Sequence, residues 1–156
     1  MKIGVEILLF IVLGIVVFQD MKFRAISWVL IPVLFIILIV KAFAYSETTD
    51  LVFNTLVNIG FVVILFVLLA IYMSVKNGRL TNIINSYLGI GDVLFFLAIS
   101  VAFSPLNFLL FFVISMTITL LFFIAYKIIK KNTSPELPLA GGMAAVMIVL
   151  NVITII

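Results

Sequence analysis

The sequence contains neither cysteine nor histidine among its 156 residues. Without cysteine there are no disulfide bonds, no thiolate metal sites and no cysteine nucleophile. Without histidine there are no serine–histidine triads, no histidine-dependent zinc sites and no imidazole general base. We expect no metal and no cofactor, and any chemistry this chain performs must rely on other groups, of which its carboxylates are the best candidates.

Charge is also scarce: charged residues make up 10% of the chain, whereas hydrophobic residues make up 67%. The mean hydropathy is +1.52. This composition excludes a soluble globular protein and predicts an integral membrane protein whose main partner is the lipid bilayer. The net charge is +3, but the basic residues are scattered between apolar segments. Scattered cations indicate membrane topology, so we expect no nucleic-acid partner.

Apolar segments long enough to cross a bilayer as helices recur along the whole chain. We predict an all-α protein of six transmembrane helices, in a single domain over residues 1–156. The predicted spans are Ile3–Gln19, Trp28–Tyr45, Leu51–Val75, Ser86–Phe103, Leu106–Tyr126 and Leu137–Ile156. The first run lacks the small-residue cleavage site of a secretory signal peptide, so we interpret it as a span.

Two of these spans adjoin one another at Ser104 and Pro105. A single helix from Val93 to Tyr126 would be about 51 Å long, far longer than the bilayer core. We therefore predict a tight turn at these two residues.

Seven of the nine basic residues fall in the first, third and fifth connectors between the spans. They are Lys22, Arg24, Lys76, Arg79, Lys127, Lys130 and Lys131. By the positive-inside rule these connectors are cytoplasmic, so both termini are predicted to face outward.

Of the six acidic residues, Asp92 is placed most unexpectedly, within "GIGDVLFF" at positions 89–96. If Asp92 were a helix N-cap, the helix from Val93 to Phe103 would be about 16 Å long and could not cross the membrane. We therefore expect the helix to begin near Ser86 and to carry Asp92 below the cytoplasmic surface. A carboxylate within a membrane usually marks a functional site.

Asp20 closes the first predicted span on the same side of the membrane as Asp92. The other four carboxylates, Glu6, Glu47, Asp50 and Glu136, are interpreted as solvated or interfacial charges. For Asp20 a terminal charge paired with Arg24 is the simpler alternative. Together, however, Asp20 and Asp92 predict a carboxylate pair facing one cavity.

A pair of carboxylates about 3 Å apart shares one proton, because the two cannot both ionise comfortably. The ionised member can take a proton from a water that attacks a peptide carbonyl. The protonated member hydrogen-bonds the carbonyl oxygen and later supplies the proton of the leaving amine. This mechanism requires none of the side chains that the sequence lacks.

The two aspartate motifs resemble those of the type IV prepilin peptidases, a family of GxGD intramembrane aspartyl proteases. The first motif is "DMKFRAIS" at positions 20–27, the second is "GIGDVLF" at positions 89–95, and "ELPLAGG" at positions 136–142 resembles the family's proline-containing start of its last span. The resemblance covers almost the whole chain. It implies that Asp20 and Asp92 are catalytic. The supporting motif residues are Gly89, Gly91, Lys22, Arg24 and Ile26.

The chain departs from the family pattern at two places. Ser27 and Trp28 stand where the family commonly has Pro-Asn, and Leu94 stands where it commonly has lysine. The glycines of the second motif are expected to let another helix backbone approach the carboxylate. The small residues Ala140, Gly141, Ala144 and Ala145 have small-xxx-small spacing and are expected to let the last span pack closely.

The resemblance implies an aspartic-type endopeptidase in the cytoplasmic (inner) membrane, with its site facing the cytoplasm. Its partners would be pilin-like precursors with a basic leader and an apolar helix. Because the chain has no cysteine and no room for the cysteine-bearing loop of the bifunctional members, it resembles the short, peptidase-only members. Two alternatives stay open: a small proton- or ion-coupled transporter, and a non-catalytic assembly factor with the same fold. The sequence identifies neither the individual substrate nor an oligomeric state.

Overall fold

The described parts of the chain form six helices and no strand, as the sequence predicts. The computed structural model describes residues 2–45, 48–78, 89–129 and 137–155. The helices are α1 (Lys2–Phe23), α2 (Leu30–Tyr45), α3 (Thr48–Asn77), α4 (Ile90–Ile99), α5 (Pro105–Ile129) and α6 (Leu139–Ile155). The all-helical fold class is therefore confirmed.

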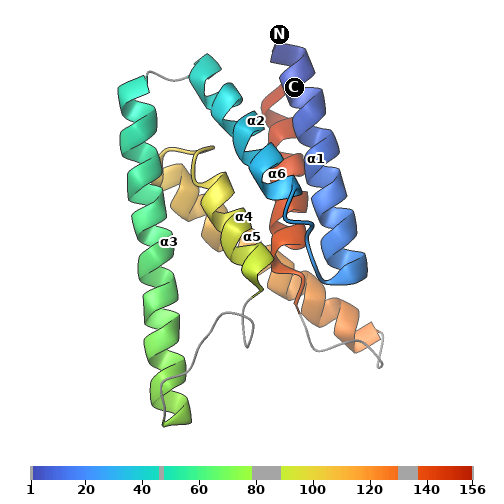
Figure 1. Ribbon diagram of the computed structural model, residues 1–156. Helices are drawn as coiled ribbons and strands as arrows, with labels where there is room; N and C mark the ends of the chain where they lie inside the picture. Colours follow the sequence, from blue (N-terminus) through green and yellow to red (C-terminus); the bar gives the residue numbers. More distant parts are fainter. Residues whose placement is uncertain (1, 46–47, 79–88, 130–136, 156) are drawn as a thin grey trace.

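The helices run alternately up and down, so that the start of α1 and the end of α6 lie at the same end of the bundle (Figure 1). α6 packs most extensively against α1, and it also contacts α5 and α4. α2 packs against α1 and α4. α3 stands along one side, where it touches α5, α2 and α4 and is the least enclosed of the long helices (Figure 1).

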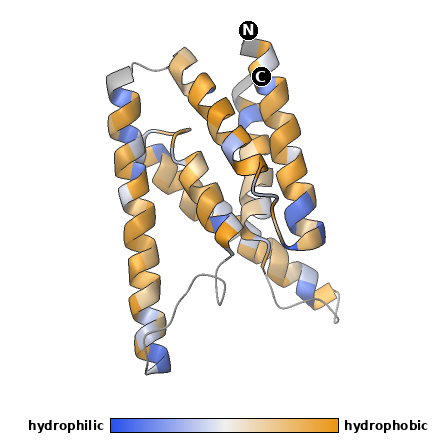
Figure 2. Ribbon diagram, in the orientation of Figure 1, coloured by the Kyte–Doolittle hydropathy of each residue, from blue (hydrophilic) through white to orange (hydrophobic). Residues whose placement is uncertain are grey.

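The exterior of the bundle is apolar along most of its length (Figure 2). By length and composition, three described segments can cross a membrane: Ile3–Phe23, Asp50–Asn77 and Pro105–Ile129. The other three helices are apolar but shorter. Large apolar exteriors are typical of proteins that contact lipid. Three of the described helices are therefore long and apolar enough to cross a membrane by themselves.

The core is built mainly from aliphatic side chains of α1 and α2 and from phenylalanines of α4 and α5. Phe96 of α4 and Phe112 of α5 meet edge to face, with ring centroids 5.3 Å apart. Phe61 of α3 meets Phe112 in the same way, at 5.7 Å. Such edge-to-face pairs fix the relative position of the rings. These aromatic contacts therefore hold α4 against α5 and α5 against α3. α4 is the helix that carries Asp92.

The first helix is longer than predicted, because it continues past Gln19 to Phe23. Asp20 and Lys22 consequently lie inside the last turn of α1 rather than in a connector. Arg24 ends the helix with a left-handed backbone conformation (φ 54°), and its N–H donates to the Asp20 carbonyl at 3.1 Å. A left-handed residue with this hydrogen bond is a common helix terminator. The helix thus ends one turn later than hydropathy alone suggests.

The predicted span Ser86–Phe103 is wrong in its bounds, because α4 covers only Ile90–Ile99. Gly89 is extended (φ −68°, ψ 140°), so the helix cannot continue back through it, and Asp92 lies in the first turn. Two glycines weaken the helix at this point, and an acidic residue is favourable in a first turn. Residues 86–88 lie outside the described residues, as do Arg79, Lys130, Lys131, Glu47 and Glu136.

The C-terminal end of α4 is held inside the protein, which helps to explain how such a short helix is tolerated. At its far end, the Asn58 side chain of α3 donates to the carbonyls of Ser100 and Phe103, both at 2.8 Å. Asn58 is 1% exposed. It satisfies carbonyl groups that the end of the helix leaves without partners. The chain then turns, and α5 begins at Pro105, which confirms the predicted break.

Candidate active site

Asp20 is buried at the end of α1, with 5% of its surface exposed. Its Oδ2 accepts a hydrogen bond from the backbone N–H of Gly141, at 2.6 Å. Gly141 lies in the first turn of α6, 121 positions further along the chain. Asp20 is therefore a tertiary contact of the last helix, and it does not lie at a solvated helix end.

Asp92 is half-buried in the first turn of α4. Its Oδ1 accepts a hydrogen bond from the backbone N–H of Ala140, at 3.0 Å. The same carboxylate interacts with the backbone N–H of Gly89, the residue before α4. An acidic residue at the third position that reaches back to the N-cap is one half of a capping box. Asp92 thus joins the starts of two helices, α4 and α6.

The start of α6 is the point at which both aspartates meet. The first hydrogen bond inside this helix runs from the Gly142 N–H to the Pro138 carbonyl at 3.1 Å, which leaves earlier N–H groups without helical partners. Pro138 has no side-chain acceptor that could cap them. Asp92 and Asp20 accept from two of these N–H groups instead. The positive end of the helix dipole favours carboxylates at this position.

The two carboxylates also act on each other and on one nearby cation. Asp20 lies close enough to Asp92 for its negative charge to act on that carboxyl group. The positive charge of Arg24 acts on Asp20 in the opposite sense, because it attracts the negative charge of that carboxylate. The hydrogen bonds described above come from neutral N–H groups, each of which fills one of about four acceptor positions on a carboxylate. Both side chains therefore keep capacity to bind a water or a substrate group.

The glycines of the second motif face side chains, whereas the sequence predicted the backbone of another helix there. A methyl group added at Gly91 would meet the Ile26 side chain at 3.5 Å, and one added at Gly89 would meet Asp92 Oδ2 at 3.3 Å. Gly91 and Ile26 belong to the two separate motifs. The contact between them brings the connector after α1 against the start of α4, and so brings both motifs together.

The glycine with the closest contact to the site is Gly141, which the sequence indicated only as a packing residue. A methyl group added there would lie 2.9 Å from both Cβ and Oδ2 of Asp20. Carbon atoms do not normally approach so closely, so a side chain at this position would displace the carboxylate. The signal was present in "PLAGG" at positions 138–142, where a proline start is followed by small residues.

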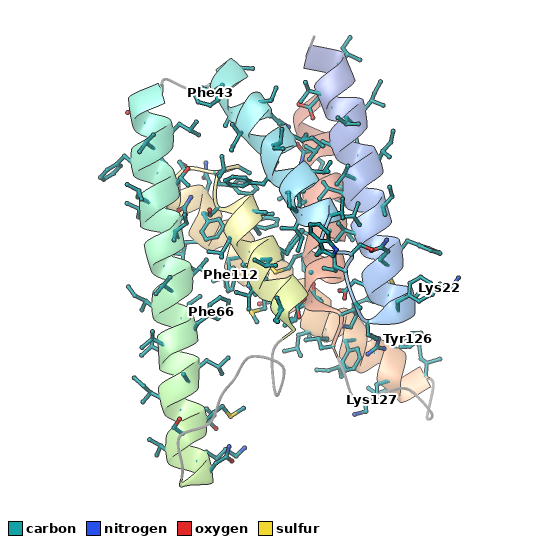
Figure 3. The ribbon with its side chains drawn as sticks, viewed as in Figure 1. Lys22, Phe43, Phe66, Phe112, Tyr126 and Lys127 are labelled. Atoms are coloured by element: carbon teal, nitrogen blue, oxygen red, sulfur yellow. The ribbon has the colours of Figure 1, made fainter. Side chains whose placement is uncertain are left out.

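Lys22 lies on the exposed surface of α1, where its side chain points outward from the bundle (Figure 3). Its Nζ is 5.1 Å from the ring centroids of both Phe18 and Phe23. Ser27, where the resembled family commonly has proline, donates its N–H to the Gln19 Oε1 at 2.9 Å. A proline could not make this bond. The hydrogen bond between Ser27 and Gln19 therefore holds the connector after α1 in place, and a proline at position 27 would remove it.

Within the described ranges, no group of three or more acidic side chains lies close enough to hold a metal ion. Leu94, which stands where the family commonly has lysine, is 38% exposed on α4. Comparisons of the chain with protein-family models, with curated proteins and with solved structures found no match.

Proposed function

We propose that this protein is an intramembrane aspartic endopeptidase in which Asp20 and Asp92 form the catalytic pair. One observation carries the proposal: two aspartates from separate helices converge on adjacent N–H groups at the start of α6. In the proposed reaction, one carboxylate takes a proton from the attacking water. The other hydrogen-bonds the peptide carbonyl and then protonates the leaving amine.

The proposal includes six membrane spans, with the aspartates near the cytoplasmic face. The basic residues Lys22, Lys76 and Lys127 lie in the last turns of α1, α3 and α5, at one end of the bundle. The positive-inside rule assigns this end to the cytoplasm and the two termini to the outer side. α4 is too short to span alone, but helix ends at membrane depth are tolerated when they are buried in protein.

The substrate class follows from the resemblance of the two aspartate motifs to the prepilin peptidases. We propose a pilin-like precursor whose basic leader lies in the cytoplasm and whose apolar helix enters the membrane beside the enzyme. The scissile bond would then lie at the depth of Asp20 and Asp92. The exposed cations of the enzyme do not attract a basic leader, so affinity would come from apolar packing and anionic lipids.

A non-catalytic role is the second candidate, and the same hydrogen bonds favour it. Because the two carboxylates cap α6, they could be retained for folding alone, in an assembly factor that keeps the architecture without the reaction. An ion path receives less support. Between Glu6 and Asp20, the buried side chains of α1 are Leu9, Val12, Leu13 and Val16, all apolar and at most 5% exposed.

The deciding experiment is co-expression with a pilin-like precursor and comparison of wild type, Asp20→Asn and Asp92→Asn. Asparagine keeps an oxygen that accepts the α6 N–H, so the fold should be preserved while the proton chemistry is lost. We expect processing to fall by at least about 10³-fold in either variant, with unchanged amounts of enzyme in the membrane. Processing at the wild-type rate in either variant would contradict the proposed pair.

The assembly-factor alternative gives a different result in the same experiment. In that case wild type does not process the precursor, and both asparagine variants support pilus or secretion assembly as well as wild type does. Alanine variants provide the control for capping, because alanine cannot accept the Gly141 or Ala140 N–H. They should lower the amount of folded protein as well as activity.

A further inference from the structure

A second polar cluster joins α1 and α6 at the ends of these helices that lie far from the aspartates. It is formed by Glu6, Lys41 and Asn151. Lys41 of α2 makes an ion pair with Glu6 of α1, with its Nζ 2.9 Å from Oε1 and 3.0 Å from Oε2. The same Nζ donates to the Asn151 Oδ1 of α6 at 2.5 Å. We call these three residues the Lys41 clamp. The sequence indicated only an interfacial charge at Glu6, and the structure adds Lys41 as its ion-pair partner.

The clamp is largely withdrawn from the surface of the bundle. The side chains of Lys41 and Glu6 are 25% and 14% exposed, and Asn151 is 9% exposed. Asn151 also donates to the Met147 carbonyl within α6, which fixes its amide orientation. In apolar surroundings an unpaired polar group is costly, so these partners are strongly held together. The clamp therefore defines one position of α6 relative to α1 and α2.

The clamp and the aspartates lie at opposite ends of the same helix pair. Asn151 is eleven positions after Ala140 on α6, which is about 16 Å and close to three full turns. Glu6 and Asp20 are fourteen positions apart on α1, which is about 21 Å and nearly four turns. On each helix, the two polar sites therefore lie on nearly the same face. A movement of α6 along its axis at one end is transmitted to the other.

Between the clamp and the aspartates, the apolar contacts of α6 define its axial position less sharply than the polar contacts at its two ends do. Apolar packing is non-directional, and methionine side chains adapt their shape to small shifts. The buried residues of α6 between Gly141 and Asn151 are Met143, Ala144 and Met147. A slip of one residue moves a helix by about 1.5 Å, enough to break a 2.6 Å hydrogen bond between Gly141 and Asp20. Directional polar contacts are the ones that specify register.

We infer that the Lys41 clamp sets the axial position of α6 and thereby positions the Ala140 and Gly141 N–H groups against Asp92 and Asp20. Lys41 and Asn151 are then positioning residues, acting on the site from the far end of the bundle. The consequence for turnover rests on the proposed peptidase function. The consequence for helix register does not, so the two can be tested separately.

Helix register can be read by cross-linking, because the chain has no cysteine of its own. Pairs of introduced cysteines would combine one position on α1 with one on α6, and the strongest disulfide in isolated membranes identifies the facing residues. Suitable positions are Leu13, Val16, Val17, Ala144, Met147 and Ile148. The scan is repeated with Asn151→Leu, which has a similar size and leaves the Glu6–Lys41 ion pair intact.

We expect the strongest pair to shift along α6 by at least a residue in Asn151→Leu. It should return to the wild-type pair in Asn151→Gln, whose longer side chain still offers an amide oxygen to Lys41. Lys41→Met removes the other half of the same bond and provides an independent second variant. Val152→Leu, at an exposed position of the same turn, is the control. A wild-type pattern in both Asn151→Leu and Lys41→Met would overturn the inference.

Turnover gives the second readout. In Asn151→Leu we expect kcat to fall by about 10- to 100-fold with an unchanged KM, and in Asn151→Gln we expect it to recover. A residue that merely stabilises the fold would lower the amount of enzyme without changing kcat per folded molecule, and that result would also overturn the inference. If wild type has no peptidase activity, the proposed function fails, while the cross-linking pattern still decides the role of the clamp.

Discussion

The two ends of the α1–α6 pair both contain carboxylates, but they compensate the negative charge in different ways. At one end, Glu6 faces the ammonium group of Lys41 at 2.9 Å. At the other, Asp20 and Asp92 accept hydrogen bonds from backbone N–H groups at the start of α6. The first carboxylate has a full positive charge as its partner, whereas the other two are held largely by neutral donors and the helix dipole.

This difference separates a structural carboxylate from a candidate catalytic one. A carboxylate paired with an ammonium group fixes a second side chain in place, because removing either partner of a largely buried ion pair is destabilising. A carboxylate held by N–H groups can gain and lose a proton while it stays in place, since either form still offers an oxygen as acceptor. The same helix pair thus contains one end suited to fixing structure and one suited to proton transfer.

The sharpest test of the aspartate end is Gly141→Ala. The new methyl group would meet Asp20 at 2.9 Å, so the carboxylate has to move away from its N–H donor. We expect precursor processing per folded molecule to fall by about 10²-fold, together with a smaller fall in the amount of folded enzyme, because the Gly141 N–H loses its acceptor. Gly14→Ala on α1 is the matched control, because nothing lies within 4 Å of the added methyl group. Equal processing by the two variants would show that Gly141 does not position Asp20 for the reaction.

Gly142→Ala tests whether the neighbouring glycine serves packing instead. Its added methyl group would clash with the Thr119 side chain on α5 and not with the aspartates. We expect the free energy of unfolding to fall by about 2 kcal/mol, measured by thermal unfolding in detergent. In a Thr119→Ala background the loss should be smaller. An additive double mutant would show that Thr119 is not the obstacle.

Glu6→Gln tests the ion-pair end with the same change of carboxylate to amide that is proposed for the aspartates. We expect the free energy of unfolding to fall by about 1 kcal/mol, because a charged hydrogen bond becomes neutral. Processing per folded molecule should stay at the wild-type value, since Lys41 still contacts Asn151. A large loss of turnover in this variant would show that Glu6 also affects catalysis, and would contradict the distinction between a structural and a catalytic end.

Lys22→Gln should have the smallest effect, although Lys22 belongs to the first aspartate motif. Its ammonium group lies over Phe18 and Phe23 on the exterior of α1 and makes no described contact with Asp20. We expect processing and membrane abundance to match those of wild type in the co-expression assay. A marked fall in processing would indicate that Lys22 contacts the substrate.

Local sequence patterns predicted much of the fold, because hydropathy and helix-breaking residues act over short distances. The apolar runs predicted six helices, and Pro105 marked the break that the structure has before α5. The start of α4 was placed too early, because the prediction required every helix to span a membrane alone. That requirement did not consider contacts from other helices. Asn58, on α3, donates hydrogen bonds to the carbonyls beyond the end of α4.

The same limit applies to the candidate site. Two motifs on the same predicted side of the membrane singled out Asp20 and Asp92, and the structure brings both to the start of α6. The role of Ala140 and Gly141 as donors was missed, because "PLAGG" indicates a helix start and close packing but not which side chains its backbone N–H groups will face. The Glu6–Lys41 pair was missed for a related reason: nothing local indicates which of several helices a charged residue will face.

By itself, the sequence determined that the chain is helical and apolar, that thiol and imidazole chemistry are excluded, and which carboxylates are unusual. These properties follow from composition and from the period and length of apolar runs. Only the tertiary structure decided how each carboxylate is compensated, by a lysine for Glu6 and by a helix start for Asp20 and Asp92. That choice depends on contacts between residues 35, 48 and 121 positions apart, which the packing of α2 against α1 and of α6 against α4 and α1 brings together.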